Sequence, residues 1–226
     1  MTWGSLAPAT IRTQVTMPLR FGDGFATAGR VYTFEGLVDG REHVAVGLGE
    51  YALTVARPTV GVRQAAGPPL VRLHSECLTG DVLGSQRCDC GGQLAEAVRR
   101  ITVAGGFLLY LRQEGRGIGL YAKLDAYVLQ DSGLDTYEAN LALGYGADER
   151  TYTAAAQMLH ALGVDEVALL SNNPDKAGQL EELGVTVCER VPTAVHLSRS
   201  NERYLAAKAD RGGHNLARVW DEEAEA

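Results

Sequence analysis

Residues 153–187, TAAAQMLHALGVDEVALLSNNPDKAGQLEELGVTV, contain the same local pattern twice in succession. In each half, a segment with helical spacing ends at a glycine and leads into a short apolar strand. The helices are expected at 153–162 and 176–183, the glycines are Gly163 and Gly184, and the strands are expected at 167–170 and 185–187. Because helices and strands alternate, the sequence predicts an α/β fold in which a mixed sheet is flanked by helices.

The segments upstream extend this pattern. Residues 17–55 are expected to form short strands separated by turns. The turns are expected at 21–25 and 38–40, strands at 43–48, 71–74 and 107–111, helices at 93–103 and 118–130, and a proline-containing loop at 57–69. An irregular N-terminal segment, 1–16, and an acidic flexible tail, 217–226, are expected on either side of one domain, 17–216.

Composition limits the possible functions. The chain has 226 residues, 46% of them hydrophobic and 22% charged, which is typical of a globular protein with a full core. No apolar run approaches the roughly 18 residues of a membrane span, and no secretory signal is visible, so we expect a cytoplasmic protein with no membrane partner. The net charge of −7 argues against non-specific nucleic-acid binding. It leaves a phosphorylated small molecule possible, because a few converging arginines can hold one.

Cys77, Cys88 and Cys90 lie within one short stretch. In the reducing cytoplasm, clustered cysteines indicate a metal site rather than disulfides. Three thiolates can hold one zinc ion and leave its fourth position open, as in catalytic sites. Two alternatives remain: buried cysteines without a metal, or a closed structural site completed by Cys188. Cys188 follows an alternating Val pattern, so we interpret it as a packed strand residue, and we expect Gly91 and Gly92 to let the turn bend sharply.

The segment 112–120, RQEGRGIGL, lies between an expected strand and an expected helix. In this context backbone amides often bind phosphate, and the arginines add donors for its oxygens. Glu114 could bind Mg²⁺ or an amino group of a base. The alternative is a connecting turn with solvated charges, because the segment matches neither the P-loop nor the Rossmann fingerprint.

Two further segments are polar. Asp148 and Arg150 could face one site from a strand or turn, although a surface ion pair is the usual outcome for such neighbours. Residues 169–176 end a strand in a polar loop, and ligands gather at the carboxyl ends of strands in α/β sheets. Asn172 and Asn173 could instead be simple turn formers before Pro174.

Together these segments resemble the GTP cyclohydrolase II family. The motifs HSECLTGD, RCDCG, RQEGRGIGL, DTYEAN, ADER, SNNPDK and ERVP occur in the family's order, and the match is collinear from about Leu19 to about Leu216. The resemblance implies a GTP cyclohydrolase II-like fold and a homodimeric enzyme that needs one Zn²⁺ per chain and Mg²⁺. It implies hydrolysis of GTP with opening of the guanine imidazole ring. The implied products are formate, pyrophosphate and 2,5-diamino-6-(5-phosphoribosylamino)pyrimidin-4(3H)-one, in the first step of riboflavin biosynthesis.

The resemblance also assigns roles to residues. It implies that the three cysteines bind the metal, that Asp148 is a proton acceptor and that Arg150 is a nucleophile toward the α-phosphate. Tyr127 matches a tyrosine that is associated with complete turnover in the family. The implied GTP contacts are Arg72, Leu73, His74, Ser75, Glu76, Gln93, Glu114, Gly115, Arg116, Thr136, Ser171 and Lys176. Ser171 stands where threonine is more usual but keeps a hydroxyl. Segment 21–25 carries an extra glycine and the 57–69 loop is long, both outside the motifs.

Three points of chemistry stay open at this stage. A guanidinium remains protonated in proteins, so electrostatic stabilisation of the leaving pyrophosphate is a simpler role for Arg150 than nucleophilic attack. The sequence His74-Ser75-Glu76 is similar to the H-x-E of zinc nucleotide deaminases, but the Cys88-Asp-Cys90 spacing lacks their P-C-x-x-C partner. A paralogue that performs a partial reaction or uses a related nucleotide is the third alternative.

Overall fold

The computed structural model describes residues 7–52, 67–146, 148–198 and 201. Its strands are β1 (Thr10–Arg20), β2 (Ala26–Glu35), β3 (Val44–Leu48), β4 (Leu70–Ser75), β5 (Gly106–Leu111), β6 (Glu166–Leu170) and β7 (Thr186–Val191). Its α-helices are α1 (Leu78–Asp81), α2 (Cys90–Ala104), α3 (Leu120–Asp131), α4 (Thr136–Ala142), α5 (Thr153–Ala161) and α6 (Pro174–Glu182). A 3₁₀ turn, Glu114–Gly117, follows β5.

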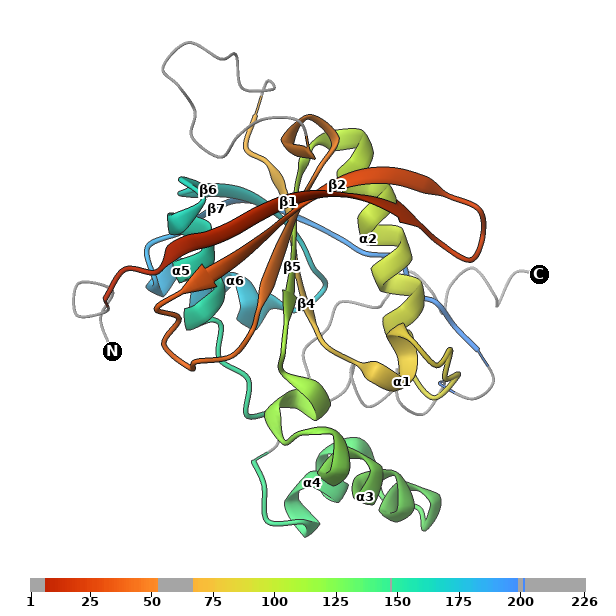
Figure 1. Ribbon diagram of the computed structural model, residues 1–226. Coiled ribbons are helices and arrows are strands. Elements are labelled where there is room, and N and C mark those ends of the chain that lie inside the picture. Colours follow the sequence, from red (N-terminus) through yellow and green to blue (C-terminus); the bar gives the residue numbers. More distant parts are fainter. Residues whose placement is uncertain (1–6, 53–66, 147, 199–200, 202–226) are drawn as a thin grey trace.

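The strands form one seven-stranded sheet in the order β1-β2-β3-β5-β4-β6-β7. The pairs β1–β2, β2–β3 and β3–β5 are antiparallel, whereas β4 pairs in parallel with β5 and β6, and β6 in parallel with β7. The long β1–β2 hairpin crosses the top of the view in Figure 1. The prediction of a mixed α/β sheet is therefore confirmed.

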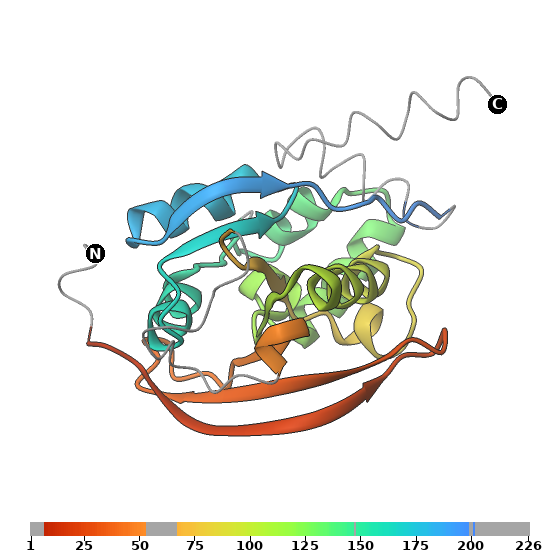
Figure 2. The ribbon, with the colours of Figure 1, turned by 90° about the horizontal axis from the view of Figure 1, so that it is seen from above.

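Side chains alternate between the two faces of the sheet and build two hydrophobic cores. On β5, Phe107, Leu109 and Leu111 belong to the core covered by α5 and α6, whereas Leu108 belongs to the core under α2. Figure 2 shows these helices on opposite sides of the parallel strands. Two covered faces explain why β5 and β6 are almost entirely apolar, and why nearly all of β4 is buried although it carries Arg72 and His74.

The carboxyl ends of β4, β5 and β6 point toward the same side of the molecule. The chain continues from β4 into the cysteine segment and from β5 through the 3₁₀ turn into α3. Helices α3 and α4 lie together beyond this edge, as the lower lobe in Figure 1. Asp135 caps α4 by accepting bonds from Tyr137 N and Glu138 N, which fixes where the lobe's second helix begins.

Most expected elements are confirmed within one to three residues, but the structure differs from expectation in one segment, one unexpected helix and one side chain. Residues 10–16 are not irregular, because they belong to strand β1. Helix α4 falls in a segment for which no helix was expected. Cys188 lies on strand β7 as expected, but it is exposed rather than packed because β7 is an edge strand.

Some expectations lie outside the described residues. They include 1–6 of the N-terminal segment, most of the 57–69 loop, and the tail 217–226. The limits of the domain, 17 and 216, stay a prediction. Within the described ranges, no helix combines the length and apolar character that a membrane span requires.

Candidate active site

A pocket with about 1040 Å³ of open space lies at the carboxyl ends of β4, β5 and β6. Each strand leads directly into residues that line it, which is the usual place for a ligand in an α/β sheet. The predicted site residues in its lining are Arg72, His74, Ser75, Glu76, Cys77, Cys88, Cys90, Gln93, Glu114, Gly115, Arg116, Tyr127, Thr136, Arg150, Ser171 and Lys176. Leu73 and Asp148 are not in the lining, so the structure brings together all of the predicted residues except these two.

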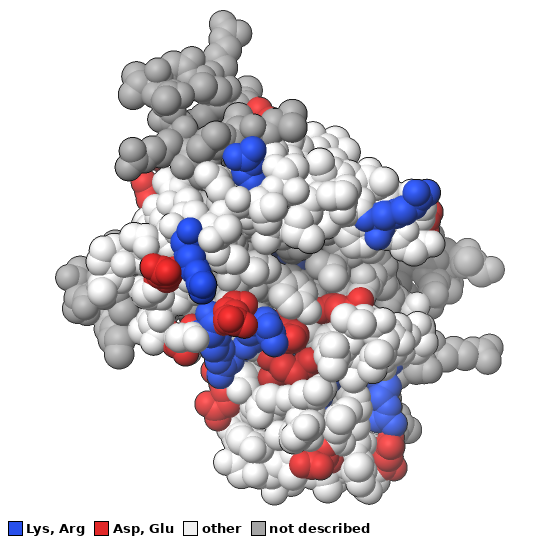
Figure 3. All heavy atoms as spheres, viewed as in Figure 1, with Lys and Arg blue, Asp and Glu red and all other residues white. Residues whose placement is uncertain are grey.

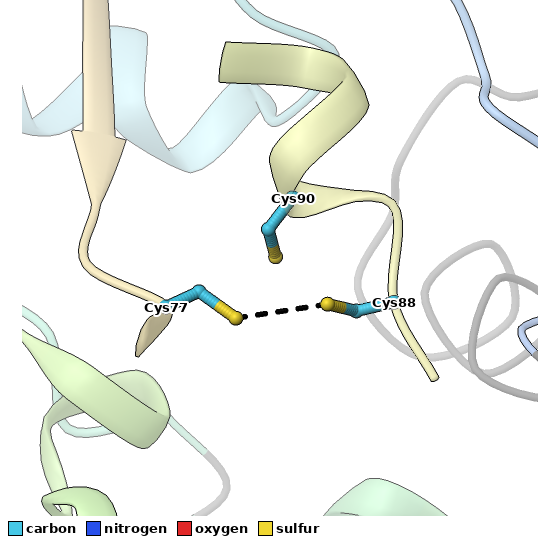
Figure 4. A group of neighbouring side chains, drawn as sticks. All are labelled: Cys77, Cys88 and Cys90. Carbon is cyan, nitrogen blue, oxygen red and sulfur yellow. Dashed lines mark hydrogen bonds between the residues drawn. The ribbon is translucent and has the colours of Figure 1, made fainter. Parts of the chain in front are cut away.

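The three cysteines meet in the wall of the pocket. Cys77 follows β4, Cys88 lies in the next loop and Cys90 begins α2, and Figure 4 shows their sulfurs turned toward one another. The three Sγ atoms lie within 4.8 Å of one another, with Cys77 and Cys88 at 3.6 Å. The pKa of Cys77 is lowered by hydrogen bonds with Cys88 and Cys90 and by nearby Lys123. In turn, the interaction with Cys77 raises the pKa of Cys88 to about 11.

This geometry fits a zinc ion. Two thiolates on a tetrahedral zinc, each bound at about 2.3 Å, lie about 3.8 Å apart, close to the spacing of Cys77 and Cys88. Among the described residues, no fourth cysteine, histidine or carboxylate belongs to the cluster. Cys188 is exposed on β7 and does not complete the site. The donor set is therefore that of an open metal site.

Glycines allow the cysteine turns to approach one another. A Cβ on Gly80 would lie 2.7 Å from the sulfur of Cys88, and a Cβ on Gly91 would lie 2.5 Å from the carbonyl oxygen of Gly80. Gly92 packs against the ring of His196. Neither Gly91 nor Gly92 has a positive φ, and both lie in the first turn of α2. The expectation that they bend the turn sharply is wrong, since they are needed for close packing instead.

A buried hydrogen-bond network around Asp81 holds the cysteine segment in place. The Asp81 carboxylate accepts from Cys77 N at 3.0 Å and from the Tyr110 hydroxyl at 2.8 Å, and it lies 3.1 Å from His74 Nε2. Burial lowers the pKa of His74 despite the opposing effect of Asp81. The neutral ring therefore donates from Nε2 to Asp81, which fixes its orientation at the pocket wall.

Lys123, which the sequence reading did not select, reaches the same cluster from α3. Its Nζ lies 3.2 Å from Cys77 Sγ and 2.8 Å from Glu114 Oε1. Burial alone would lower the pKa of Lys123, but Glu114 and Cys77 raise it overall, so the group stays charged. Helical spacing at 118–130 gave no sign that this lysine points inward. No local sequence pattern reveals this orientation, because the partners of Lys123 lie in two other segments of the chain.

The loop after β5 has an unusual backbone. Gly115 and Arg116 both adopt left-handed conformations, with φ of 62° and 61°, and Arg116 is the only non-glycine residue with positive φ in the described part of the chain. Such a conformation costs free energy and persists where the surroundings hold it. The Arg116 guanidinium stacks 4.4 Å from the centre of the Tyr137 ring on α4. The loop thus presents Arg116 to the pocket in a fixed position.

Arg150 lines the pocket beside Arg116, and Asp148 holds it there. Arg150 Nε donates to Asp148 Oδ1 at 2.8 Å, and Arg116 Nη1 lies 4.0 Å from Asp148 Oδ2. Burial would raise the pKa of Asp148, but these arginines outweigh it and the pKa is lowered. In Figure 3, acidic and basic side chains gather where the α3–α4 lobe meets the rest of the molecule. The Asp148–Arg150 pair is therefore partly buried at the edge of the pocket.

Two more cations lie in the pocket wall. Arg72 donates to the carbonyl of Leu170 at 3.0 Å and to Gln93 Oε1 at 2.7 Å, and Lys176 Nζ donates to the carbonyl of Leu73 at 2.7 Å. The side chain of Leu73 itself belongs to the core. Buried polar atoms that find no partner among the described residues include Arg72 Nε, Gln113 Oε1, Asn140 Nδ2 and Thr193 Oγ1, all from residues in the lining. Such atoms are rare in folded proteins, and in a pocket wall they are available to bind water or a polar ligand.

An α/β sheet with an open three-thiolate metal site beside a cationic pocket is typical of metal-dependent hydrolases that act on phosphorylated small molecules. The family model of GTP cyclohydrolase II matches residues 10–192. The chain is 51% identical over 186 residues to "GTP cyclohydrolase-2" of Vibrio cholerae, covering 82% of this chain and 88% of that protein. It is 48% identical over 213 residues to the protein of the same name from Pseudomonas aeruginosa, covering 92% and 94% of the two chains. The chain belongs to the GTP cyclohydrolase II family.

Proposed function

We propose that this protein hydrolyses GTP, opens the guanine imidazole ring and releases formate and pyrophosphate. The remaining product is the diaminopyrimidinone 2,5-diamino-6-(5-phosphoribosylamino)pyrimidin-4(3H)-one, which makes this the first step of riboflavin biosynthesis. One observation carries the proposal: an open three-sulfur site and several arginine and lysine side chains line the same pocket. The first suits hydrolysis at a carbon atom, and the second suits a triphosphate.

In the pocket wall, Cys77, Cys88 and Cys90 would hold one Zn²⁺ per chain. When bound, zinc lowers the pKa of a coordinated water to about 7 and so supplies a nucleophile at neutral pH. His74 is fixed by Asp81 beside this site, and Tyr127 lines the pocket next to Lys123. These groups would orient the guanine ring toward the sulfur cluster.

In the same pocket, Arg116, Arg150 and Lys176 would bind the triphosphate, and Mg²⁺, when bound, would supply further positive charge to offset that of the phosphates. The position of Asp148 outside the lining supports an orienting role for it, because its carboxylate bonds Arg150 and approaches Arg116. A paired, protonated guanidinium stabilises negative charge on a leaving pyrophosphate and is a poor nucleophile. We therefore propose that Arg150 acts electrostatically.

The Glu114 carboxylate has a more internal role than Mg²⁺ or base binding. Its Oε2 accepts from Leu78 N at 2.6 Å, and its Oε1 accepts from Lys123 and from Gly115 N at 3.0 Å. Both oxygens are thus used within the protein. We propose that Glu114 joins the 3₁₀ turn after β5 to the cysteine segment rather than contacting GTP directly.

The remaining partner assignments are proposals that rest on the sequence and on family membership. According to these proposals, the protein forms a homodimer, lies in the cytoplasm and has no nucleic-acid partner. The apolar side chains of Tyr121, Leu124 and Val128 are exposed on α3, which supports a protein contact on the α3–α4 lobe. Light scattering of the purified chain would give the mass of the particle, and a monomer at micromolar concentration would contradict the dimer.

The matched pair Cys88→Ser and Cys188→Ser tests the proposed function. The Cys88 variant should lose zinc and formate release, whereas the Cys188 variant should keep both, because Cys188 is exposed away from the cluster. Zinc per chain, formate, pyrophosphate and ammonia are measured for each variant with GTP and Mg²⁺. Ammonia in place of formate would indicate a deaminase, and pyrophosphate without formate in the wild type would indicate a paralogue with a partial reaction. Loss of zinc from the Cys188 variant would indicate a closed structural site.

A further inference from the structure

Lys123 is the one buried lysine that contacts a sulfur of the cysteine cluster in the described part of the chain. It lies in the first turns of α3, and its side chain extends toward the cysteines instead of solvent. Its whole side chain is nearly buried, at 9% exposure. A charged lysine is almost never buried to this degree without partners, so its contacts deserve a functional explanation.

All three N–H donors of the Lys123 ammonium are used by the site. Nζ lies 3.2 Å from Cys77 Sγ, 2.9 Å from Thr79 Oγ1 and 2.8 Å from Glu114 Oε1. An ammonium has three donors and no acceptor, so none is left for a substrate. Lys123 therefore acts through other residues, not on GTP itself.

These contacts join three separate segments. Cys77 and Thr79 follow β4, Glu114 follows β5, and Lys123 comes from the lobe beyond the sheet. The same Glu114 carboxylate also accepts from Leu78 N. The lysine thus connects the sulfur cluster with the loop that positions Arg116 in the pocket.

The charge balance of the site gives the connection a chemical meaning. Three thiolates and the Glu114 carboxylate carry more negative charge than one divalent metal ion can neutralise. A hydrogen bond from an ammonium draws electron density from the thiolate that accepts it. A metal bound by less electron-rich sulfur is a stronger Lewis acid, and such outer contacts typically tune a metal site.

We propose that Lys123 is a positioning residue that limits the electron donation of Cys77 to the bound metal and holds Glu114 in place. This inference rests on the proposed function, because it assumes that the cysteines bind the metal. It predicts that loss of the ammonium changes the metal–sulfur bond and the turnover number, while GTP binding is largely kept.

The test uses the protein with Co²⁺ in place of zinc, since cobalt–thiolate charge-transfer absorption reports the donor strength of sulfur. Lys123→Met is compared with Lys176→Met, the matched control. Lys176 is also a buried lysine of the pocket wall, but it bonds the carbonyl of Leu73. In Lys123→Met the band should move to longer wavelength, and the zinc enzyme should lose roughly 10- to 100-fold in kcat with little change in KM. In Lys176→Met the band should stay in place while KM for GTP rises.

Lys123→Met leaves the Glu114 carboxylate buried without its cation, which could prevent folding. The double variant Lys123→Met with Glu114→Gln removes that charge, and it should show the same shift to longer wavelength. Glu114→Gln alone keeps the bond to Cys77, so its band should not move to longer wavelength.

If the cobalt–thiolate band and kcat of Lys123→Met and of the double variant equal those of the wild type, this inference is overturned and the proposed function is not. A wild-type chain that takes up neither cobalt nor zinc would overturn the proposed function as well. A band shift confined to the Lys123 variants supports the inference, and a shift of equal size in Lys176→Met would contradict it.

Discussion

Asp148 holds Arg150 through two side-chain hydrogen bonds, because Nε donates to Oδ1 at 2.8 Å and Nη2 donates to Oδ2. The backbone N–H of Arg150 donates to the same carboxylate at 3.1 Å. Arg150 lines the pocket and Asp148 does not. The carboxylate therefore holds the arginine, and the arginine faces the pocket.

The first prediction concerns this pair. Asp148→Asn should lower kcat/KM for GTP by roughly 100-fold, because misplaced groups in an active site cost about this much. Zinc content should stay at the wild-type level, since Asp148 does not belong to the cysteine cluster. Steady-state kinetics and metal analysis of the variant check both expectations, and full activity would contradict the orienting role.

The electrostatic role of Arg150 can be tested separately. If Arg150 were a covalent nucleophile, an acid-stable guanylyl adduct on this residue should appear after quenching during turnover. We expect mass spectrometry of the quenched enzyme to find no such adduct, because the guanidinium stays protonated beside Asp148. A trapped adduct would show that the covalent assignment is right.

Arg116 gives a prediction about strain. Its left-handed backbone, with φ of 61°, is accessible to glycine without cost. Arg116→Gly should therefore be more stable than Arg116→Ala by about 1 kcal/mol, measured by urea denaturation. Both variants should bind GTP more weakly, since both lose the guanidinium that stacks on Tyr137. Equal stabilities would show that the loop relaxes when the side chain is removed.

Gly80 gives a prediction about the metal site. A methyl group at this position would lie 2.7 Å from the sulfur of Cys88 and 3.1 Å from that of Cys77. Gly80→Ala should therefore lower zinc per chain and formate release together. Gly178→Ala is the control, because it is exposed in α6 and its Cβ meets no atom within 4 Å. That change should raise stability by up to about 1 kcal/mol and leave the metal content unchanged.

Glu96 and His196 give a prediction about pH. The Glu96 carboxylate lies 3.1 Å from His196 Nε2 and accepts from Ala194 N and Arg100. Burial alone would raise the pKa of Glu96, but these bonds lower it to about 2. The bond with Glu96 raises the pKa of His196. The pair thus ties α2 to the segment that follows β7.

Because the pKa of Glu96 is lower in the folded protein, the carboxylate stabilises the fold at pH values above its unfolded pKa of about 4.3. This contribution is lost as the pH falls through the folded pKa of about 2. Because the pKa of His196 is raised in the folded protein, the protonated ring stabilises the fold at pH values below its unfolded pKa of about 6.5. This contribution is lost as the pH rises through the folded pKa. Glu96→Gln should therefore cost about 1–2 kcal/mol near pH 5.5, allowing for solvent screening of a partly exposed pair. The difference between variant and wild type should shrink toward pH 2 in denaturant titrations. A difference independent of pH would contradict this account.

The sequence was most informative where a motif follows an apolar strand. The segments after β4, β5 and β6 meet in the pocket because parallel strands end at the same edge of a sheet. The first part of strand β1, residues 10–16, was assigned to an irregular segment. Its apolar residues Ile11 and Val15 lie at alternating positions that continue to Met17, although almost all residues of the strand are exposed. Helix α4 had a usable signal in its capping box, Asp135 with Glu138.

Contacts between distant segments determine the orientation and exposure of several side chains that local sequence patterns do not predict. The inward course of Lys123 depends on partners from two other segments, Cys77 and Glu114, which no local pattern reveals. Cys188 follows the spacing of a packed residue, yet it is exposed because β7 is an edge strand and, in the described part of the chain, no further strand pairs with it. Whether an arginine–carboxylate pair lies on the surface or at a pocket likewise depends on where the lobe folds.

The most direct test of the central claim is the product balance of the purified wild-type chain with GTP and Mg²⁺. Formate, pyrophosphate and ammonia are quantified together with zinc per chain. We predict equal amounts of formate and pyrophosphate, each matching the GTP consumed, with no ammonia and with both products lost when zinc is removed by a chelator. Pyrophosphate without formate, ammonia in place of formate, or full activity in the zinc-free protein would contradict a metal-dependent opening of the guanine ring in this pocket.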